Sequence, residues 1–152
     1  MTDTDARLIE LAERCEAATG PDRELDIAIL THPAFGYRDV FEDGRLFDRG
    51  NDGYWSLEGD EKNGPLPSPT ASLDAAMTLV PENCAVDIDN GPSHWICLGK
   101  QAPMGRADVK YPKPGYDGQG DSWLTVSAIA KTMPLALCAA ALRAIASQET
   151  TR

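Results

Sequence analysis

The stretch RADVKY, residues 106–111, alternates charged side chains with Ala107, Val109 and Tyr111. Successive side chains of a β-strand point to opposite faces of its sheet, so a period of two predicts a strand with one apolar and one wetter face. We expect the three apolar residues to point inward and the three charged residues to point toward solvent.

The same alternation recurs on both sides of this stretch. Residues 84–89 and 122–128 each place an apolar residue at every second position, and Asn90-Gly91 favours a turn into a further strand at 94–99. Clean alternation is typical of antiparallel sheets with one solvated face. We therefore predict an antiparallel sheet of about four strands between residues 84 and 128.

Two helices are predicted before the sheet, at residues 5–18 and 21–30. Apolar residues in the first recur with helical spacing, and Thr4 is a suitable N-cap. Gly20 followed by Pro21 is the usual order for the end of one helix and the start of the next.

The segment TASLDAAMTLVP, residues 70–81, predicts a third helix, capped by Ser72 or Thr70 and ended by its proline. Every residue in it is explained as part of a helix, which leaves none for chemistry. The positions expected to be buried are Leu73, Met77 and Val80.

A last helix is predicted at residues 134–147, with Thr132 as its N-cap. Leu135, Cys138, Leu142 and Ile145 share one face, and the flanking alanines favour close packing on the sheet or on another helix. The whole pattern predicts a single α+β domain of residues 1–152, in which N-terminal, middle and C-terminal helices pack with the sheet as a helix–sheet–helix sandwich.

Residues 31–69 interrupt this pattern with many glycines and prolines, which indicates an irregular insertion or loop region. Two short pieces, 37–41 and 54–57, are predicted to form a small hairpin around Glu42-Asp43-Gly44.

Charge and cysteine content restrict the location and the partners of the protein. The net charge of −10 disfavours direct nucleic-acid binding, because an acidic surface repels phosphates. The N-terminal stretch MTDTDARL is unlike a secretory signal, and no apolar run is long enough to cross a bilayer. We expect a protein of a reducing cytoplasm, with buried reduced thiols at most of its four cysteines: Cys15, Cys84, Cys97 and Cys138.

The sequence contains no convincing metal, cofactor or catalytic motif. His32 and His94 have no second ligand at metal-binding spacing, and the calcium-like run from Asp48 has glycine at its third and twelfth positions. Ser93 and His94 are adjacent in a predicted strand, so their side chains point to opposite faces and do not pair as nucleophile and base. We expect no cofactor and no enzymatic activity.

The weak candidates for ligand binding are aromatic and basic residues of the predicted sheet. Cations beside aromatic rings can stack with and neutralise an anionic ligand. An alternative interpretation, which we weight more heavily, places both tryptophans of this set in the core. The set is Trp95, Arg106, Lys110, Tyr111 and Trp123.

Three segments together resemble the phage ABA-sandwich domain, a family of small phage and prophage proteins. They are EAATGPDRELD at residues 16–26, TASLDAAMTLVP at residues 70–81 and ALCAAALRA at residues 136–144. The resemblance implies a compact helix–sheet–helix domain encoded by tailed phages or prophages, with no assigned catalytic residues. It also implies that the cytoplasm in which we expect the protein is that of a bacterial host cell.

Three hypotheses of function remain open at this point. The first is a non-enzymatic phage accessory protein that binds a protein partner, with homo-oligomers also considered. The second is a protein that binds or sequesters a small anionic, nucleotide-like ligand in a counter-defence role. The third is an acidic mimic of DNA, which the basic segment after residue 100 disfavours.

Overall fold

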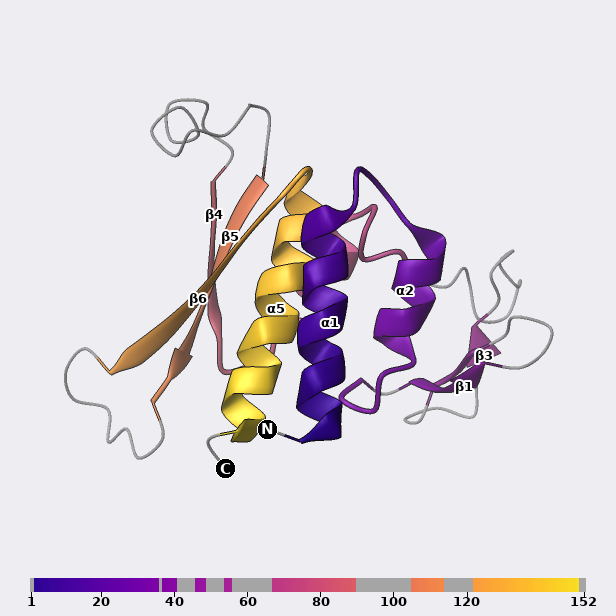
Figure 1. Cartoon of the computed structure of the whole chain (residues 1–152), viewed down its shortest axis with the longest axis horizontal. Helices are drawn as coiled ribbons and strands as arrows, with labels where there is room; N and C mark the ends of the chain where they lie inside the picture. The colour runs from indigo at the N-terminus through magenta and orange to yellow at the C-terminus, as the bar shows by residue number, and fades with distance from the viewer. Residues whose placement is uncertain are drawn as a thin grey trace.

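In a computed structural model, the chain has an α+β fold in which helices pack against an antiparallel sheet (Figure 1). The structure describes residues 2–35, 37–40, 46–48, 54–55, 67–89, 105–113 and 122–150. The helices are α1 (Asp3–Ala17), α2 (Arg23–Leu30), α3 (Leu73–Met77) and α5 (Met133–Thr150). The larger sheet has the order β4 (Ala85–Asp89), β5 (Gly105–Pro112) and β6 (Trp123–Ala130). The predicted fold class is confirmed.

The larger sheet contains three of the four expected strands, and the fourth, at 94–99, lies outside the described residues. In the register, Val109 lies opposite Val86 on one side and Val126 on the other, so the three valines share a face. Ala107, Val109 and Tyr111 are buried while Arg106, Asp108 and Lys110 are only partly so, which confirms the predicted inward and outward sets.

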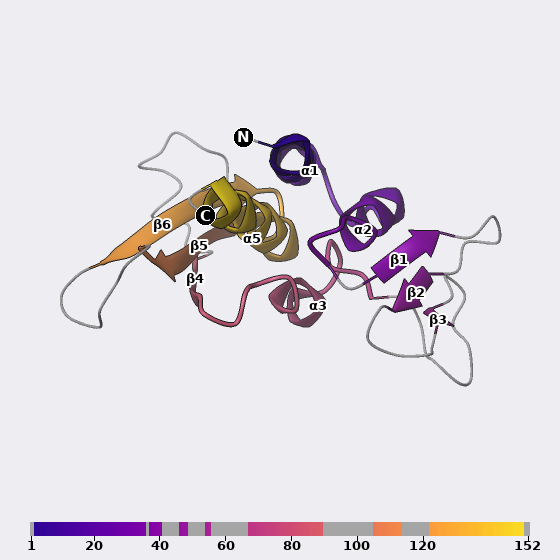
Figure 2. The same ribbon diagram turned by 90° about the horizontal axis from the view of Figure 1, so that it is seen from below.

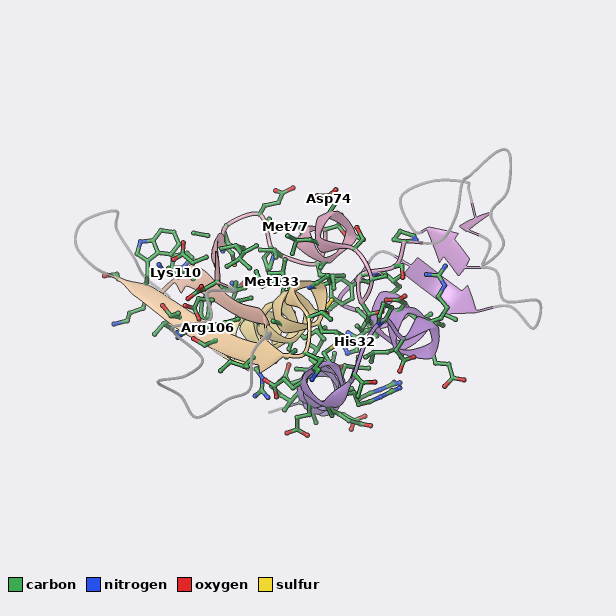
Figure 3. All side chains as sticks on the ribbon, turned by 90° about the horizontal axis from the view of Figure 1, so that it is seen from above. His32, Asp74, Met77, Arg106, Lys110 and Met133 are labelled. Carbon is green, nitrogen blue, oxygen red and sulfur yellow. The ribbon has the colours of Figure 1, made fainter. Side chains whose placement is uncertain are left out.

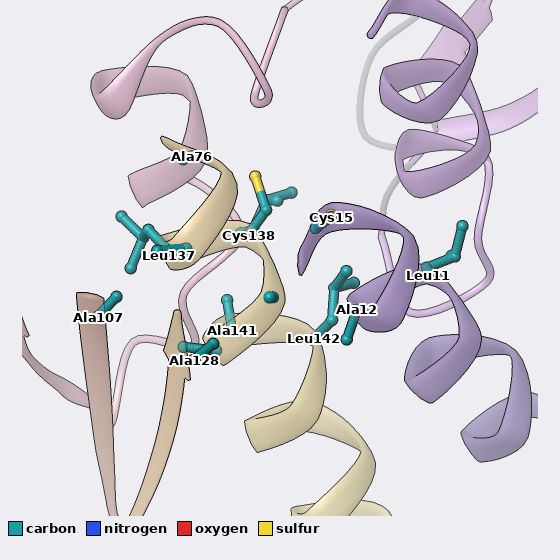
Figure 4. Close-up of a cluster of buried hydrophobic side chains, with 14 of the residues drawn as sticks. Leu11, Ala12, Cys15, Ala76, Ala107, Ala128, Leu137, Cys138, Ala141 and Leu142 are labelled. Atoms are coloured by element: carbon teal, nitrogen blue, oxygen red, sulfur yellow. The ribbon is translucent and has the colours of Figure 1, made fainter. Parts of the chain in front are cut away.

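Helix α5 is the centre of the core and is buried all round at its N-terminal half. The sequence predicts one apolar face, yet every residue from Leu135 to Leu142 is fully buried. The reason is that α5 packs on β5 and β6, against α1 on its other side and against α3, as Figure 2 shows in end view. Its side chains meet those of α1, α3 and the sheet in one cluster (Figure 4). The predicted cap is confirmed, because Thr132 Oγ1 accepts from the Leu135 N–H at 3.5 Å.

The sheet approaches the start of α5 so closely that there is no room for a side chain at Gly105. A Cβ atom there would lie 2.6 Å from the backbone nitrogen of Met133 and 2.7 Å from its Cα. Alanines continue this close approach along the strands, since Ala107 lies opposite Ala128 and both are buried. Small residues therefore set the distance between helix and sheet.

The starts of the first two helices each differ from the prediction by two residues. Thr2, and not Thr4, caps α1, because the side chains of Thr2 and Asp5 each accept a hydrogen bond from the other's backbone N–H. Asp22 caps α2, since its carboxylate accepts from the Leu25 N–H at 3.0 Å, so the helix begins after Pro21.

Helix α3 is shorter than predicted, and the expected burial of Met77 is wrong. Ser72 is its cap, as expected, but the helix ends at Met77, whose side chain is 42% exposed. Beyond it the backbone tightens into i→i+3 hydrogen bonds, including Leu79 N–H to Ala76 O at 3.0 Å. The tighter turn brings Leu79 into the core, while Leu73 and Val80 are only half-buried.

A second, small antiparallel sheet forms within the predicted insertion, beside α2 (Figure 2). Its order is β1 (Tyr37–Val40), β2 (Leu46–Asp48) and β3 (Tyr54–Trp55). The two predicted strands are present, but they do not pair with each other, because β2 lies between them and pairs with both.

Candidate functional site

The face of the larger sheet that points away from α5, called the outer face below, is the candidate site. No described helix covers it, and its residues are polar or charged at most positions (Figures 1 and 2). From the register it comprises Ala85, Asp87, Asp89, Arg106, Asp108, Lys110, Pro112, Trp123, Thr125, Ser127 and Ile129.

Opposite charges on the outer face are paired with each other. Lys110 Nζ contacts a carboxylate oxygen of Asp87 across the β4–β5 ladder. The Nε of Arg106 lies 3.1 Å from Oδ1 of Asp108, two residues along the same strand. The outer face therefore carries both signs in neighbouring pairs instead of one strongly basic or acidic field.

These pairs change the proton affinities of the outer-face groups. Burial acts to raise the pKa of Asp108, but hydrogen bonds from Ser127 and Arg106, with the charges of Arg106 and Lys110, outweigh it and lower the pKa. The hydrogen bond and charge of Asp87 raise the pKa of Lys110. Both shifts favour the ionised forms, so the charge pattern is fixed near neutral pH.

The structure brings together three of the five candidate ligand-binding residues. Arg106, Lys110 and Trp123 share the outer face, and Figure 3 shows the first two on the larger sheet. Tyr111 belongs to the opposite face and is only 6% exposed, and Trp95 lies outside the described residues. The predicted core position of Trp123 is wrong, because it lies beside Pro112 near the end of the sheet and is 44% exposed.

The candidate residues chosen from the sequence do not include the acidic and hydroxyl residues that contact the charged residues of β5 on this face. Asp87 and Ser127 contact the charged residues of β5 from the two neighbouring strands. Alternation indicated correctly that they point outward, but which residues stand side by side depends on strand register, which the alternation does not specify.

A further polar residue, His32, has a structural role. His32 is buried and links the turn after α2 to α1: its Nε2 lies 3.2 Å from Thr4 O, and its Nδ1 accepts from the Ala34 N–H at 3.1 Å. Burial, with a smaller contribution from Arg7, lowers the pKa of His32. The neutral ring satisfies both contacts, so this histidine acts as a structural connector.

The described cysteines are not arranged as nucleophiles. Cys15 and Cys138 are buried, as predicted, while Cys84 is partly exposed and Cys97 lies outside the described residues. A hydrogen bond with Cys15 and burial raise the pKa of Cys138, whose Sγ also lies 3.3 Å from Pro69 O. A thiol held in its protonated form is a poor nucleophile.

Other parts of the described chain offer less for binding. A shallow pocket of about 520 Å³ lies at the connection between α1 and α2, lined by residues 17–24 alone. Two of its three charged residues serve the fold, since Asp22 caps α2 and Arg23 donates a hydrogen bond to Pro67 O at 2.9 Å. Within the described ranges no three His, Cys, Asp or Glu side chains are grouped to hold a metal ion.

Comparison of the chain with protein-family models, with curated proteins and with solved structures gives no match. In the part of the chain that the structure describes, no helix has the length and apolar character needed to cross a membrane.

Proposed function

We propose that this protein is a non-enzymatic accessory protein, of the kind encoded by phages and prophages, which binds a protein partner in the bacterial cytoplasm through its outer face. The observation that carries the proposal is the asymmetry of the larger sheet. Helix α5 packs on the inner face of this sheet over β5 and β6, while the outer face is an ordered surface that no described element covers. The phage origin rests on the resemblance of the three sequence segments alone.

The outer face has the composition of a protein-docking surface. Paired charges of both signs give specificity by electrostatic complementarity, and the partly exposed Trp123 offers a large apolar ring of the type that dominates binding energies. The chain has a strong negative net charge, yet this face holds two cations beside three carboxylates. A partner with both signs of charge fits it better than a purely basic partner.

A charge-swap experiment tests this proposal. The variant Asp87→Lys/Lys110→Asp keeps an ion pair at the same two positions but reverses its direction. A tagged wild-type chain should capture one specific protein from host lysate at low and moderate salt, and the swapped variant should lose that protein.

The matched control makes the same two types of substitution at exposed sites elsewhere: Asp74→Lys on α3 and Lys131→Asp after β6. This control should capture the partner as the wild type does. Capture of the same protein by the Asp87/Lys110 swap, or no specific capture by the wild type, would contradict the proposal.

The geometry gives the small-ligand alternative less support. Arg106 and Lys110 already contact carboxylates, and Tyr111 faces away from them. A thermal-shift panel of nucleotides tests it directly, because a ligand at about 100 times its Kd stabilises a protein by about 2.7 kcal/mol. If no nucleotide raises the unfolding temperature, the hypothesis of a nucleotide ligand is contradicted.

A further inference from the structure

Among the described strands of the larger sheet, β4 and β6 each pair with β5 alone, and they differ in how they discourage pairing with a further strand. β4 is five residues long and carries exposed Asp87 and Asp89. β6 is eight residues long and contains no charged residue and no proline, and its register with β5 is continuous. Natural proteins usually protect an outer strand with charges, proline, bulges or shortness, and β6 has none of these devices.

The side chains in the first half of β6 are less buried than those in its second half. Ala128 and Ala130 are buried, but Leu124 and Val126, on the same inner face, are only half-buried. In both views this end of β6 runs away from α1 and α5 (Figures 1 and 2). Within the described residues β6 pairs with β5 alone.

The sequence of β6 is complementary to itself in one antiparallel register. When Val126 lies opposite Val126 of a second copy, Thr125 lies opposite Ser127, Leu124 opposite Ala128, and Trp123 opposite Ile129. Each pair lies on one face, as antiparallel pairing requires, and combines hydroxyl with hydroxyl, large with small, or aromatic with β-branched. Hydroxyl and aromatic–β-branched pairs are among the cross-strand pairs that stabilise sheets.

We propose that the protein forms a symmetric homodimer by antiparallel pairing of β6 with β6 of a second copy, so that the described strands of both copies form one continuous sheet. The two-fold axis passes between the two Val126 residues, so the contact is isologous and closed. The pairing covers Leu124, Val126 and Trp123 and extends the outer face across both copies. A foreign strand would need complementary residues, which the second copy already supplies.

The dimer does not rest on the proposed function, because it concerns the edge of β6 and not the capture of a foreign protein. One strand pair is small beside the typical stable interface of about 800 Å² per partner, so the dimer should dissociate on dilution. Sedimentation velocity of the full chain over a wide range of concentrations should show a monomer–dimer equilibrium.

Two double variants test the register and differ only in the sign of one charge. Thr125→Lys/Ser127→Lys places like charges opposite each other twice per dimer and should raise the dimer dissociation constant by about tenfold or more. Thr125→Glu/Ser127→Lys places opposite charges there and should dimerise at least as well as the wild type.

Because position 125 also lies opposite Lys110 within the chain, the fold of both variants is checked by circular dichroism. Ala71→Lys, an exposed site in the turn before α3, is the control for added positive charge and should leave the equilibrium unchanged. A wild type that stays monomeric at all concentrations overturns the proposal. The edge of β6 would then be open to pairing with a strand from another protein. Equal dimerisation of the two double variants overturns it as well.

Discussion

The inner and outer faces of the larger sheet are built from the same three described strands but differ in packing and polarity. The inner face meets α5 through small and apolar residues, with Gly105 in backbone contact distance of Met133. The outer face holds charged pairs and hydroxyls that partly contact water. Close packing restricts which residue types the inner face can hold, whereas the outer face accepts many residue types. A binding specificity can therefore be built on the outer face without changing the fold.

The largest expected effect is in the core that packs against the inner face, at Leu142 of α5, which lies beside α1 (Figure 4). Replacing this fully buried leucine, Leu142→Ala, should lower the free energy of unfolding by about 2–5 kcal/mol, because a cavity remains. Urea unfolding measures it, with the exposed outer-face change Thr125→Ala as the control. Equal losses of unfolding free energy in the two variants would contradict the view that the core contributes more to stability than the outer face.

The second effect tests the close approach of sheet and helix. Gly105→Ala should cost about 1–3 kcal/mol, because the added Cβ meets the backbone of Met133 and not a flexible side chain. Gly20→Ala is the matched control: nothing lies within 4 Å of its Cβ position, so its stability should stay the same or rise slightly. If Gly105→Ala is as stable as the wild type, small residues do not set this distance.

The third effect is a pH dependence from His32, on the helical side (Figure 3). Its pKa is lowered by folding, so below about pH 6.5 the unfolded chain takes up a proton that the folded chain does not. Stability should therefore fall as pH drops from neutral through this value, down to the folded pKa.

Urea midpoints measured above and below this value should move apart in the wild type. The separation should shrink in His32→Asn, whose side chain does not titrate in this range. An unchanged separation in His32→Asn would assign the pH dependence to other groups.

The smallest effect is expected on the outer face. Lys110→Ala removes one side of an exposed ion pair, and such pairs contribute little to stability in solution. Its thermal unfolding midpoint should match that of the wild type, while partner capture decreases. A clear loss of stability would mean that the outer face also supports the fold.

The alternation in residues 106–111 predicted which side chains face inward, because a period of two is a local property of a strand. The neighbours of α5 could not be predicted in this way, since its burial on all sides depends on three elements distant in sequence. The position of Met77 failed for a related reason: the spacing is helical, but the helix ends one turn early. For the candidate site, outward Arg106, Asp108 and Lys110 were predictable, whereas the contact between Lys110 and Asp87 required the strand register.

The contacts of Asp26 have a consequence for protein engineering. This buried carboxylate of α2 accepts from the Thr70 N–H at 2.8 Å and from Ser68 Oγ at 2.6 Å, while Asp22 and Thr70 exchange two more hydrogen bonds. The chain thus leaves the scaffold after α2 and returns to it at a point tied to the same helix. Loop-closure entropy grows only slowly with length, so a segment whose ends are fixed in this way can be exchanged for another of different length at modest cost. The region between Phe35 and Pro67 is therefore a suitable acceptor site for grafting a foreign loop or a small domain.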